Sequence, residues 1–249
     1  MSKEVAIREC VTLEELEECV QLQRDVFSLP EIELSPVRHL VVTKNAGGFT
    51  LGAYSGDELV GFVLSVPAFY RGERAIYSHM TAVREDFQSA GVGGALKWAQ
   101  RDRSLADGIK VIRWTFEPWK ARNAYFNLEK LGAVMDRFER DFYGVDRTTG
   151  PNAGHAIELS SDRLFAEWHL ESEKVVKLAA GEKFEEAGEV VGAVEVPNDW
   201  FALVADDPQK AIAVQKQIRR DFEAAFADGL LARGFHRDER HPKYLLFRS

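Results

Sequence analysis

The stretch from Gln88 to Ala95 contains three glycines and separates two patterned segments. Residues 75–83 before it are mostly apolar, as in a buried strand, and the residues after it keep a helical spacing of apolar positions up to Gly108. A helix that starts in such a turn leaves its first N–H groups unpaired and carries a partial positive charge. Glycine also lets a phosphate approach the backbone closely. The stretch therefore predicts an anion site, although a tight turn at a helix start fits the same pattern.

Two well-known phosphate motifs are excluded by the residues around these glycines. A P-loop needs Gly-Lys-Ser/Thr, which does not follow Gly91-Val92-Gly93-Gly94. The dinucleotide fingerprint needs a third glycine at a later position, which the run also lacks.

The run from Val83 to Gly93 instead resembles the acyl-CoA signature of the GNAT acyltransferase superfamily, Arg/Gln-x-x-Gly-x-Gly/Ala, beginning at Gln88. In that family the loop amides hold the CoA pyrophosphate and the preceding strand pairs with the pantetheine arm. The resemblance implies acetyl-CoA or another acyl-CoA as cosubstrate. It also implies CoA contacts from the strand end and the loop: Met80, Thr81, Ala82, Val83, Gln88, Ser89, Ala90, Gly91, Val92, Gly93, Gly94 and Ala95.

The pattern of elements over residues 1–147 agrees with this resemblance. Thr12 and Glu15 form a capping box for a first helix, and Ser35 is the expected N-cap of a second helix that ends at Gly47. Three strands, a helix, a strand, a helix and a strand follow, at 49–54, 59–66, 75–83, 91–108, 110–116, 120–131 and 134–145. Hairpins followed by crossovers predict a mixed α/β sheet with helices on its faces. This order resembles the GNAT fold, in which the central sheet splays at the glycine loop.

Residues 148–249 predict a C-terminal α/β extension packed on the first domain. Strand patterns lie at 162–170, 190–196 and 244–247. A helix is expected at 172–180, and a longer one starts at Asp207 and ends at Gly229.

Composition limits the partners and the setting. A formal net charge of −8 disfavours nucleic acid and anionic membranes. The two cysteines and six histidines lack disulfide-scaffold or metal-ligand spacing, so no metal is expected. We find no signal peptide and no apolar run that could span a bilayer, and we expect a cytoplasmic protein, with a homodimer as one assembly to test.

Amine acylation needs a neutral amine and a polarised carbonyl. His79 is the best candidate base because imidazole titrates near neutrality, although a strand histidine bonded to a neighbouring carbonyl is the more common situation. Glu117, acting through water, is a second option, and it could equally be a solvated loop residue. The resemblance implies that a backbone N–H near Thr81 or Val83 polarises the carbonyl.

The family often has a tyrosine four residues before the glycine of a Leu-Gly helix ending, where it protonates the leaving thiolate. Here that position holds Leu128, so the general acid is unassigned and water is one source of the proton. The resemblance implies CoA contacts from Asn123, Phe126 and Asn127 on this helix, and the two asparagines are spaced to share a face.

Arg113 could hold an acceptor carboxylate, or it could be a solvated strand residue. The expected reaction is direct transfer of an acyl group, acetyl by default, to the amine of a small molecule such as an amino acid. A larger donor such as succinyl-CoA fits the loop equally well. The absent tyrosine also suggests a hypothesis from another functional class, namely that the protein is a non-catalytic acyl-CoA sensor.

Overall fold

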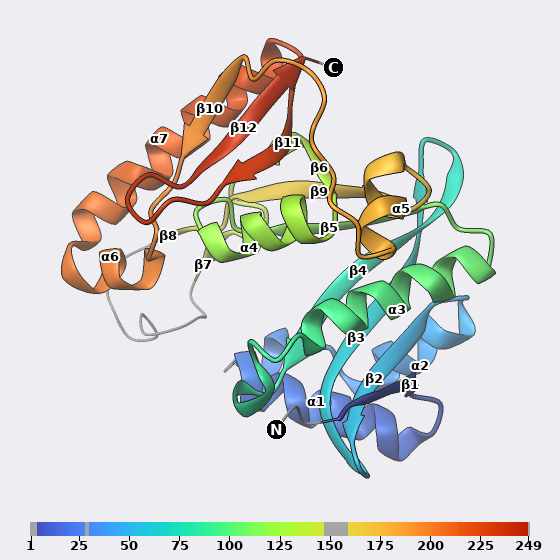
Figure 1. Ribbon diagram of the computed structural model, residues 1–249. Helices are drawn as coiled ribbons and strands as arrows, with labels where there is room; N and C mark the ends of the chain where they lie inside the picture. Colours follow the sequence, from blue (N-terminus) through green and yellow to red (C-terminus); the bar gives the residue numbers. More distant parts are fainter. Residues whose placement is uncertain (1–3, 28–29, 147–158, 249) are drawn as a thin grey trace. The chain divides into compact units, whose positions relative to one another are not determined.

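The structure is a computed structural model, and it describes residues 4–27, 30–146 and 159–248. The chain divides into two compact units, Met1–Arg113 and Trp114–Ser249, which are described separately below (Figure 1). The domain boundary expected at residue 147 lies outside the described residues.

The first unit is a mixed sheet with helices on both faces. Its elements are β1 (Ala6–Glu9), α1 (Leu13–Phe27), η1 (Glu31–Glu33), α2 (Val37–Asn45), β2 (Phe49–Ser55), β3 (Glu58–Tyr70), β4 (Glu73–Val83), η2 (Glu85–Phe87), α3 (Val92–Ala106) and β5 (Val111–Phe116), whose last residues lie in the second unit. The strand order is β1-β2-β3-β4-β5, antiparallel up to β4 and parallel between β4 and β5. The predicted mixed α/β class is confirmed.

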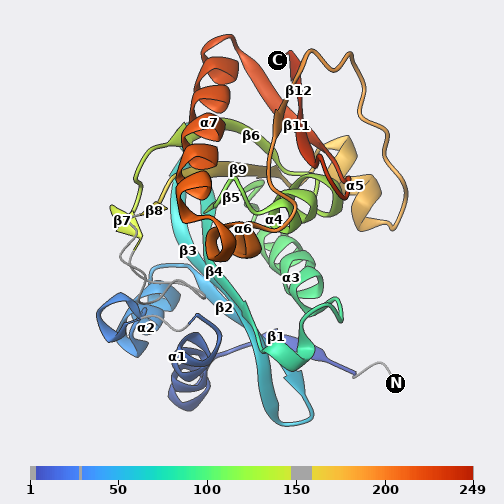
Figure 2. The ribbon, with the colours of Figure 1, turned by 90° about the vertical axis from the view of Figure 1, so that its left-hand side faces the viewer.

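Opposite faces of this sheet are covered by different helices, as Figure 2 shows. On one face, Phe62 and Leu64 of β3 and Ala82 of β4 join a buried cluster with residues of α1 and α2. On the other face, α3 packs so closely that a Cβ at Gly61 would lie 3.2 Å from Leu96. Both faces of β3 are thus buried, which explains its almost continuous apolar sequence.

The capping box at the start of α1 is confirmed. The Glu15 N–H donates to Thr12 Oγ1 (3.2 Å), and Glu15 Oε2 accepts from the N–H groups of Thr12 (3.0 Å) and Val11 (2.7 Å). Glu15 also forms an ion pair with Arg8 of β1. This pair links the helix start to the edge strand that the sequence patterns missed.

A β-bulge interrupts the pairing of β3 with β4. Leu64 pairs with Met80, whereas Ser65 pairs with Ser78, so His79 is an extra residue with no partner on β3. The ladder then continues to Tyr70, past Pro67, where the strand was expected to end. The hairpin closes through Arg71 and Gly72, which both have positive φ as a tight two-residue turn requires.

The second unit is a largely antiparallel sheet whose strand order is β9-β6-β11-β12-β10. Its elements are α4 (Ala121–Tyr125), the π-helical turn η3 (Phe126–Lys130), β6 (Val134–Glu139), β7 (Val145–Asp146), β8 (Leu159–Ser160), β9 (Arg163–His169), α5 (Glu173–Ala179), β10 (Gly192–Glu195), α6 (Trp200–Asp206), α7 (Pro208–Ala227), β11 (Leu230–His236) and β12 (Lys243–Arg248). The strand expected over 134–145 is therefore split into β6 and β7 by the turn between them.

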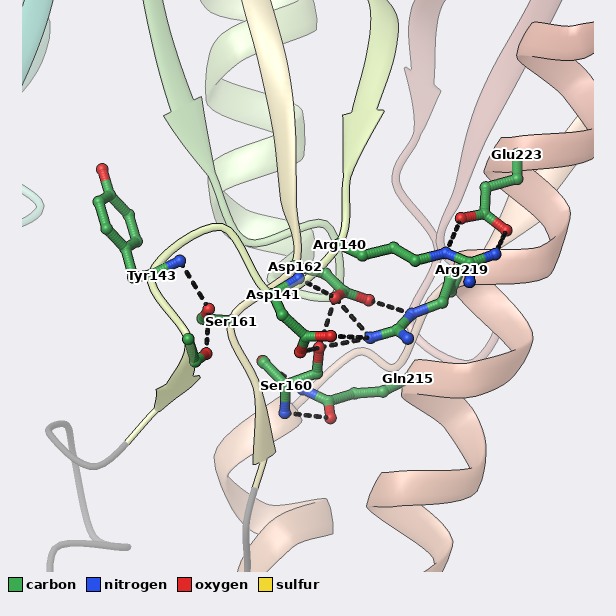
Figure 3. Close-up of polar contacts among 10 residues, drawn as sticks. Arg140, Asp141, Tyr143, Ser160, Ser161, Asp162, Gln215, Arg219 and Glu223 are labelled. Atoms are coloured by element: carbon green, nitrogen blue, oxygen red, sulfur yellow. Dashed lines mark hydrogen bonds and ion pairs between the residues drawn. The ribbon is translucent and has the colours of Figure 1, made fainter.

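A buried carboxylate fastens the β7–β8 ribbon to α7 (Figure 3). Asp162 is fully buried and accepts two hydrogen bonds from the Arg219 guanidinium, at 2.8 and 2.6 Å, and one from the Asp141 N–H at 2.9 Å. One turn away, the Gln215 amide bonds both backbone groups of Ser160. Glu223 and Arg140 add an ion pair at the surface of this network.

Among the described residues, the sequence patterns missed the strands β1, β8 and β11, the helix α6 and the short 3-10 turns η1 and η2. The N-cap expected at Ser35 was wrong, because α2 begins at Val37 after Pro36 and has no side-chain cap. Within the part of the chain that the structure describes, no helix is both long and apolar enough to cross a membrane.

Replacing Glu15 tests the capping box. We expect Glu15→Ala to lower the free energy of unfolding by about 1 kcal/mol at neutral pH, as measured by urea denaturation. The hydrogen bond from the Thr12 backbone lowers the pKa of Glu15 from 4.5 to about 2. Because the folded-state pKa is depressed, this stability is complete above pH 4.5 and is lost as the pH falls towards 2.

The difference in the free energy of unfolding between wild type and Glu15→Ala should therefore decrease at acidic pH. The control is Glu14→Ala, which alters an exposed carboxylate in the same helical turn and should leave stability unchanged. An equal loss from both variants would contradict the capping role.

Candidate functional site

The glycine stretch folds as a short connection between β4 and α3. The 3-10 turn η2 is anchored by Phe87, which is buried, and the Gln88 side chain donates from Nε2 to the Val83 carbonyl at 3.0 Å. Ser89 and Gly91 then adopt positive φ angles of 63° and 86°. The chain thereby turns back from the strand end directly into the helix.

The N-terminus of α3 is open. Gly91 is the N-cap, no side chain caps the helix, and its first turn contains no acidic residue. A Cβ at Gly91 would have no atom within 4 Å, and one at Gly93 would meet only Val83 Cγ2 at 3.8 Å. The positive φ explains the glycine at position 91, but packing does not explain the glycine at 93. Space and unneutralised helix charge make this terminus suitable for a phosphate.

A buried polar cluster joins α3 to the strands behind it. Lys97 Nζ donates to Ser78 Oγ (3.0 Å) and to Gln100 Oε1 (2.7 Å), and Gln100 Nε2 donates to Ser65 Oγ (2.8 Å). Burial lowers the pKa of Lys97 well below its ordinary value. Ser65 and Ser78 are the pair that flanks the bulge, so the cluster fixes the strand where His79 leaves the ladder. Sequence reasoning missed this cluster. A lysine and a glutamine three residues apart on a sheet-covering helix were its available signal.

His79 lies on the opposite face of β4 from Lys97. Its Nε2 is 3.1 Å from Ser35 Oγ, and its ring meets the His39 ring edge-to-face at 5.9 Å. Burial, followed by the charge of His39, lowers the pKa of His79. The ring is therefore neutral near pH 7, which is the state a general base requires. Its partner is the hydroxyl of a serine in the segment between η1 and α2, and not a neighbouring carbonyl, which is the more common partner of a strand histidine.

The end of β4 runs beyond its pairing with β5. The β4–β5 ladder joins Ile76 to Ile112 and Tyr77 to Arg113, whereas β4 continues to Val83. Thr81 and Ala82 pair with β3 on the other side. In the first unit, residues 79–83 thus carry one row of backbone groups that points away from β3.

The remaining candidates have other surroundings. Arg113 ends the first unit, and its Cζ lies 4.6 Å from the centre of the Tyr70 ring. Glu117, in the second unit, is engaged by Lys120 at 2.7 Å and by Arg163 at 3.6 Å. Two cations thus occupy the carboxylate that was considered as a base.

The helix that carries the three other candidates also belongs to the second unit. Asn123 is exposed on α4, and Phe126 begins the π-helical turn. Asn127 is 5% exposed, and its backbone carbonyl accepts a hydrogen bond from the Ala133 N–H. Leu128, at the position of the family's tyrosine, is fully buried. In the described parts of both units, no group of three or more His, Cys, Asp or Glu side chains could hold a metal ion.

Comparison with known proteins gives a family match over much of this region. The model of the Acetyltransferase (GNAT) family matches residues 13–133, a range that includes β4, the glycine turn and α3. No curated protein matches the chain.

Solved structures agree with the family match. A putative GNAT acetyltransferase from Desulfovibrio desulfuricans is 16% identical with a TM-score of 0.54, over 67% of this chain and 99% of that one. A GNAT acetyltransferase from Elizabethkingia anophelis with acetyl-CoA bound is 16% identical with a TM-score of 0.50, over 67% and 98%. A Bacillus subtilis acetyltransferase in complex with CoA is 19% identical with a TM-score of 0.50, over 67% and 99%. At these identities the similarities show the fold.

We predict that His79 and His241 titrate on opposite sides of the ordinary histidine value of 6.5. Burial lowers the pKa of His79, whereas the hydrogen bond that His241 Nδ1 donates to the Glu195 carboxylate raises the pKa of His241. NMR titration of ¹⁵N-histidine-labelled protein measures both midpoints in one sample, and His79→Gln assigns the signal. A His79 midpoint at or above that of His241 would show that the ring is solvated and not buried.

Proposed function

Residues 13–133 belong to the GNAT acetyltransferase family, whose members are acyl-CoA-dependent N-acetyltransferases, and from this we propose the reaction that the chain catalyses. It transfers an acyl group, acetyl by default, from acyl-CoA to the amine of a small molecule such as an amino acid or its derivative. Donor and acceptor react directly in a ternary complex.

The observation that carries this proposal is the open N-terminus of α3. The residues present fit a diphosphate: free space at Gly91 and Gly93, no acidic side chain in the first turn and no side-chain cap. The backbone N–H groups of this turn would hold the phosphates of CoA. The structures with bound CoA or acetyl-CoA support the choice of ligand, because they share this fold.

The acyl transfer step is assigned to β4. The amine nitrogen forms a bond to the thioester carbonyl carbon as the carbon–sulfur bond breaks. His79 takes the proton from the amine, and a backbone N–H of the Thr81–Val83 segment stabilises the charge on the carbonyl oxygen. The leaving thiolate takes its proton from the imidazolium or from water, because Leu128 offers none. Glu117 is a poorer base, since Lys120 and Arg163 occupy its carboxylate.

The acceptor class rests on Arg113. A guanidinium near the end of the β4–β5 ladder could bind a carboxylate bidentately, which favours an amino acid or a derivative with a free acid. The loop would contact the phosphates of CoA and not the acyl group, so succinyl-CoA remains an alternative donor.

A non-catalytic acyl-CoA sensor is the second candidate. It is favoured by Leu128, which is fully buried and has no titratable proton to give the thiolate.

We predict that Gly93→Asp weakens CoA binding by roughly tenfold or more, because it places a carboxylate beside the phosphates. Isothermal titration with CoA measures this loss. Gly93→Ala is the matched control, since its methyl group makes only an ordinary contact with Val83 and adds no charge. Pantetheine, which lacks the diphosphate, should bind equally to all three proteins. Equal CoA affinity in wild type and Gly93→Asp would show that the phosphates do not bind at this turn.

We predict acyl-CoA-dependent acylation of small amines that His79→Ala slows by about a hundredfold or more in kcat, which is the lower end of the contribution of a general base. The measurement is thiol release from acetyl-CoA and succinyl-CoA with a panel of amino acids and amines, followed by mass spectrometry of the products. Glu117→Gln is the control and should retain most of the activity. CoA binding without acylation of any amine would favour the sensor.

A further inference from the structure

The ring of His79 is held by a serine from a distant part of the chain. Ser35 Oγ lies 3.1 Å from His79 Nε2, although the two residues are 44 positions apart. Ser35 is 6% exposed and follows η1, before the start of α2. Its hydroxyl is not used as a helix cap, since α2 is capped by Pro36 without a side-chain bond. The hydroxyl therefore serves the histidine.

Ser35 is itself fixed by a second buried side chain. The Gln23 amide on α1 bonds both backbone groups of Ser35: Nε2 donates to the carbonyl at 3.1 Å, and Oε1 accepts from the N–H at 2.9 Å. Gln23 is fully buried. A bidentate bond of this kind leaves the Ser35 backbone little freedom, and the position of its hydroxyl is fixed with it. Gln23, Ser35 and His79 thus form a chain from α1 to β4.

This series of hydrogen bonds engages only one nitrogen of the His79 ring. Nε2 bonds Ser35, whereas Nδ1 has no hydrogen-bond partner among the described residues. In a neutral imidazole one nitrogen carries the proton and the other the lone pair, and the hydrogen bond made by one of them selects the tautomer. If Nε2–H donates to Ser35 Oγ, the lone pair lies on Nδ1, where it can accept a proton.

The bulge explains why this arrangement occurs at residue 79. Ser78 points to the α3 face, where it bonds Lys97 and Gln100. His79 meets residues of the opposite side, and Met80 also packs on the α1–α2 cluster. Two successive side chains thus lie on one face, as an extra residue in one strand allows. His79 is directed to Ser35 without taking the place of Met80 in the core.

We propose that Ser35, held by Gln23, is a positioning residue for the acyl transfer: it accepts the Nε2–H of His79 and keeps the lone pair on Nδ1. This inference rests on the proposed function. The proton of the acceptor amine passes to Nδ1 as the nitrogen–carbon bond forms and the carbon–sulfur bond breaks. The resulting imidazolium still donates Nε2–H to Ser35, so the hydrogen bond persists through the step.

The first test reads the tautomer and needs no substrate. Long-range ¹⁵N–¹H correlation spectra of the ¹⁵N-histidine-labelled chain distinguish a protonated from an unprotonated ring nitrogen, and His79→Gln assigns the signals. We expect Nδ1 to be unprotonated in the wild type above the pKa of the ring, and a mixture of tautomers in Ser35→Ala. A wild-type ring protonated on Nδ1 would overturn the inference.

The second test separates positioning from general stability. We expect Ser35→Ala to lower kcat by about tenfold, a fraction of the effect of a general base, while KM for acyl-CoA and CoA affinity stay unchanged. Ser35→Thr, which keeps the hydroxyl, should restore most of kcat. In a His79→Ala background, Ser35→Ala should have no further effect, because the two residues act as a unit. Ser172→Ala, the same change in the second unit, is the control and should leave kcat unchanged.

The outcomes of the two tests are distinguishable. If wild type acylates amines and Ser35→Ala has the wild-type kcat, the positioning role is overturned and the proposed function stands. If no amine is acylated, the proposed function is wrong. The tautomer spectrum still decides whether Ser35 determines the tautomer of the His79 ring. Loss of kcat by Ser35→Ala in the His79→Ala background would also overturn the inference, since Ser35 would then act without the histidine.

Discussion

One extra residue in β4 determines the arrangement of the candidate site. Because side chains alternate along a strand, an inserted residue reverses the faces of every residue that follows it. Before the bulge, Ser78 faces α3; after it, Ala82 lies in the α1–α2 cluster and Val83 approaches Gly93. Without His79 as an extra residue, Val83 would face the wrong helix layer. The bulge thus sets the position of His79, the proposed base, and brings Val83 beside the glycine turn.

Two buried polar groups stabilise the bulge from opposite faces. Lys97 and Gln100 bond the serines that flank it, and Ser35, fixed by Gln23, bonds the histidine itself. Buried polar groups are costly unless they are paired, so each side of the bulge carries its own hydrogen-bonded network. The second unit uses the same principle at Asp162, whose buried carboxylate is paired with Arg219 (Figure 3). In both units, polar contacts fix the places where regular strand pairing stops.

Two local features followed directly from the sequence. The Thr12–Glu15 box predicts a helix start because both bonds lie within one turn, and the glycines predict an open helix terminus because only backbone is present there. The role of Ser35 could not be predicted. Its hydroxyl looked like a helix cap, and only the folded chain brings it to a histidine 44 positions away. The Lys97 cluster was missed for the same reason, since Lys97 and Gln100 lie on α3 and their serine partners lie on β3 and β4.

The sequence by itself determined the local elements: the capping box, the glycine turn, most helix and strand ranges and the mixed α/β class. These depend on residues within a few positions of one another, so the residue pattern contains the cause. The tertiary structure decided the register of β3 against β4, the edge strand β1 and the partner of each buried polar group. Those features arise when distant segments compete for hydrogen bonds and burial, and no short stretch of residues specifies the outcome.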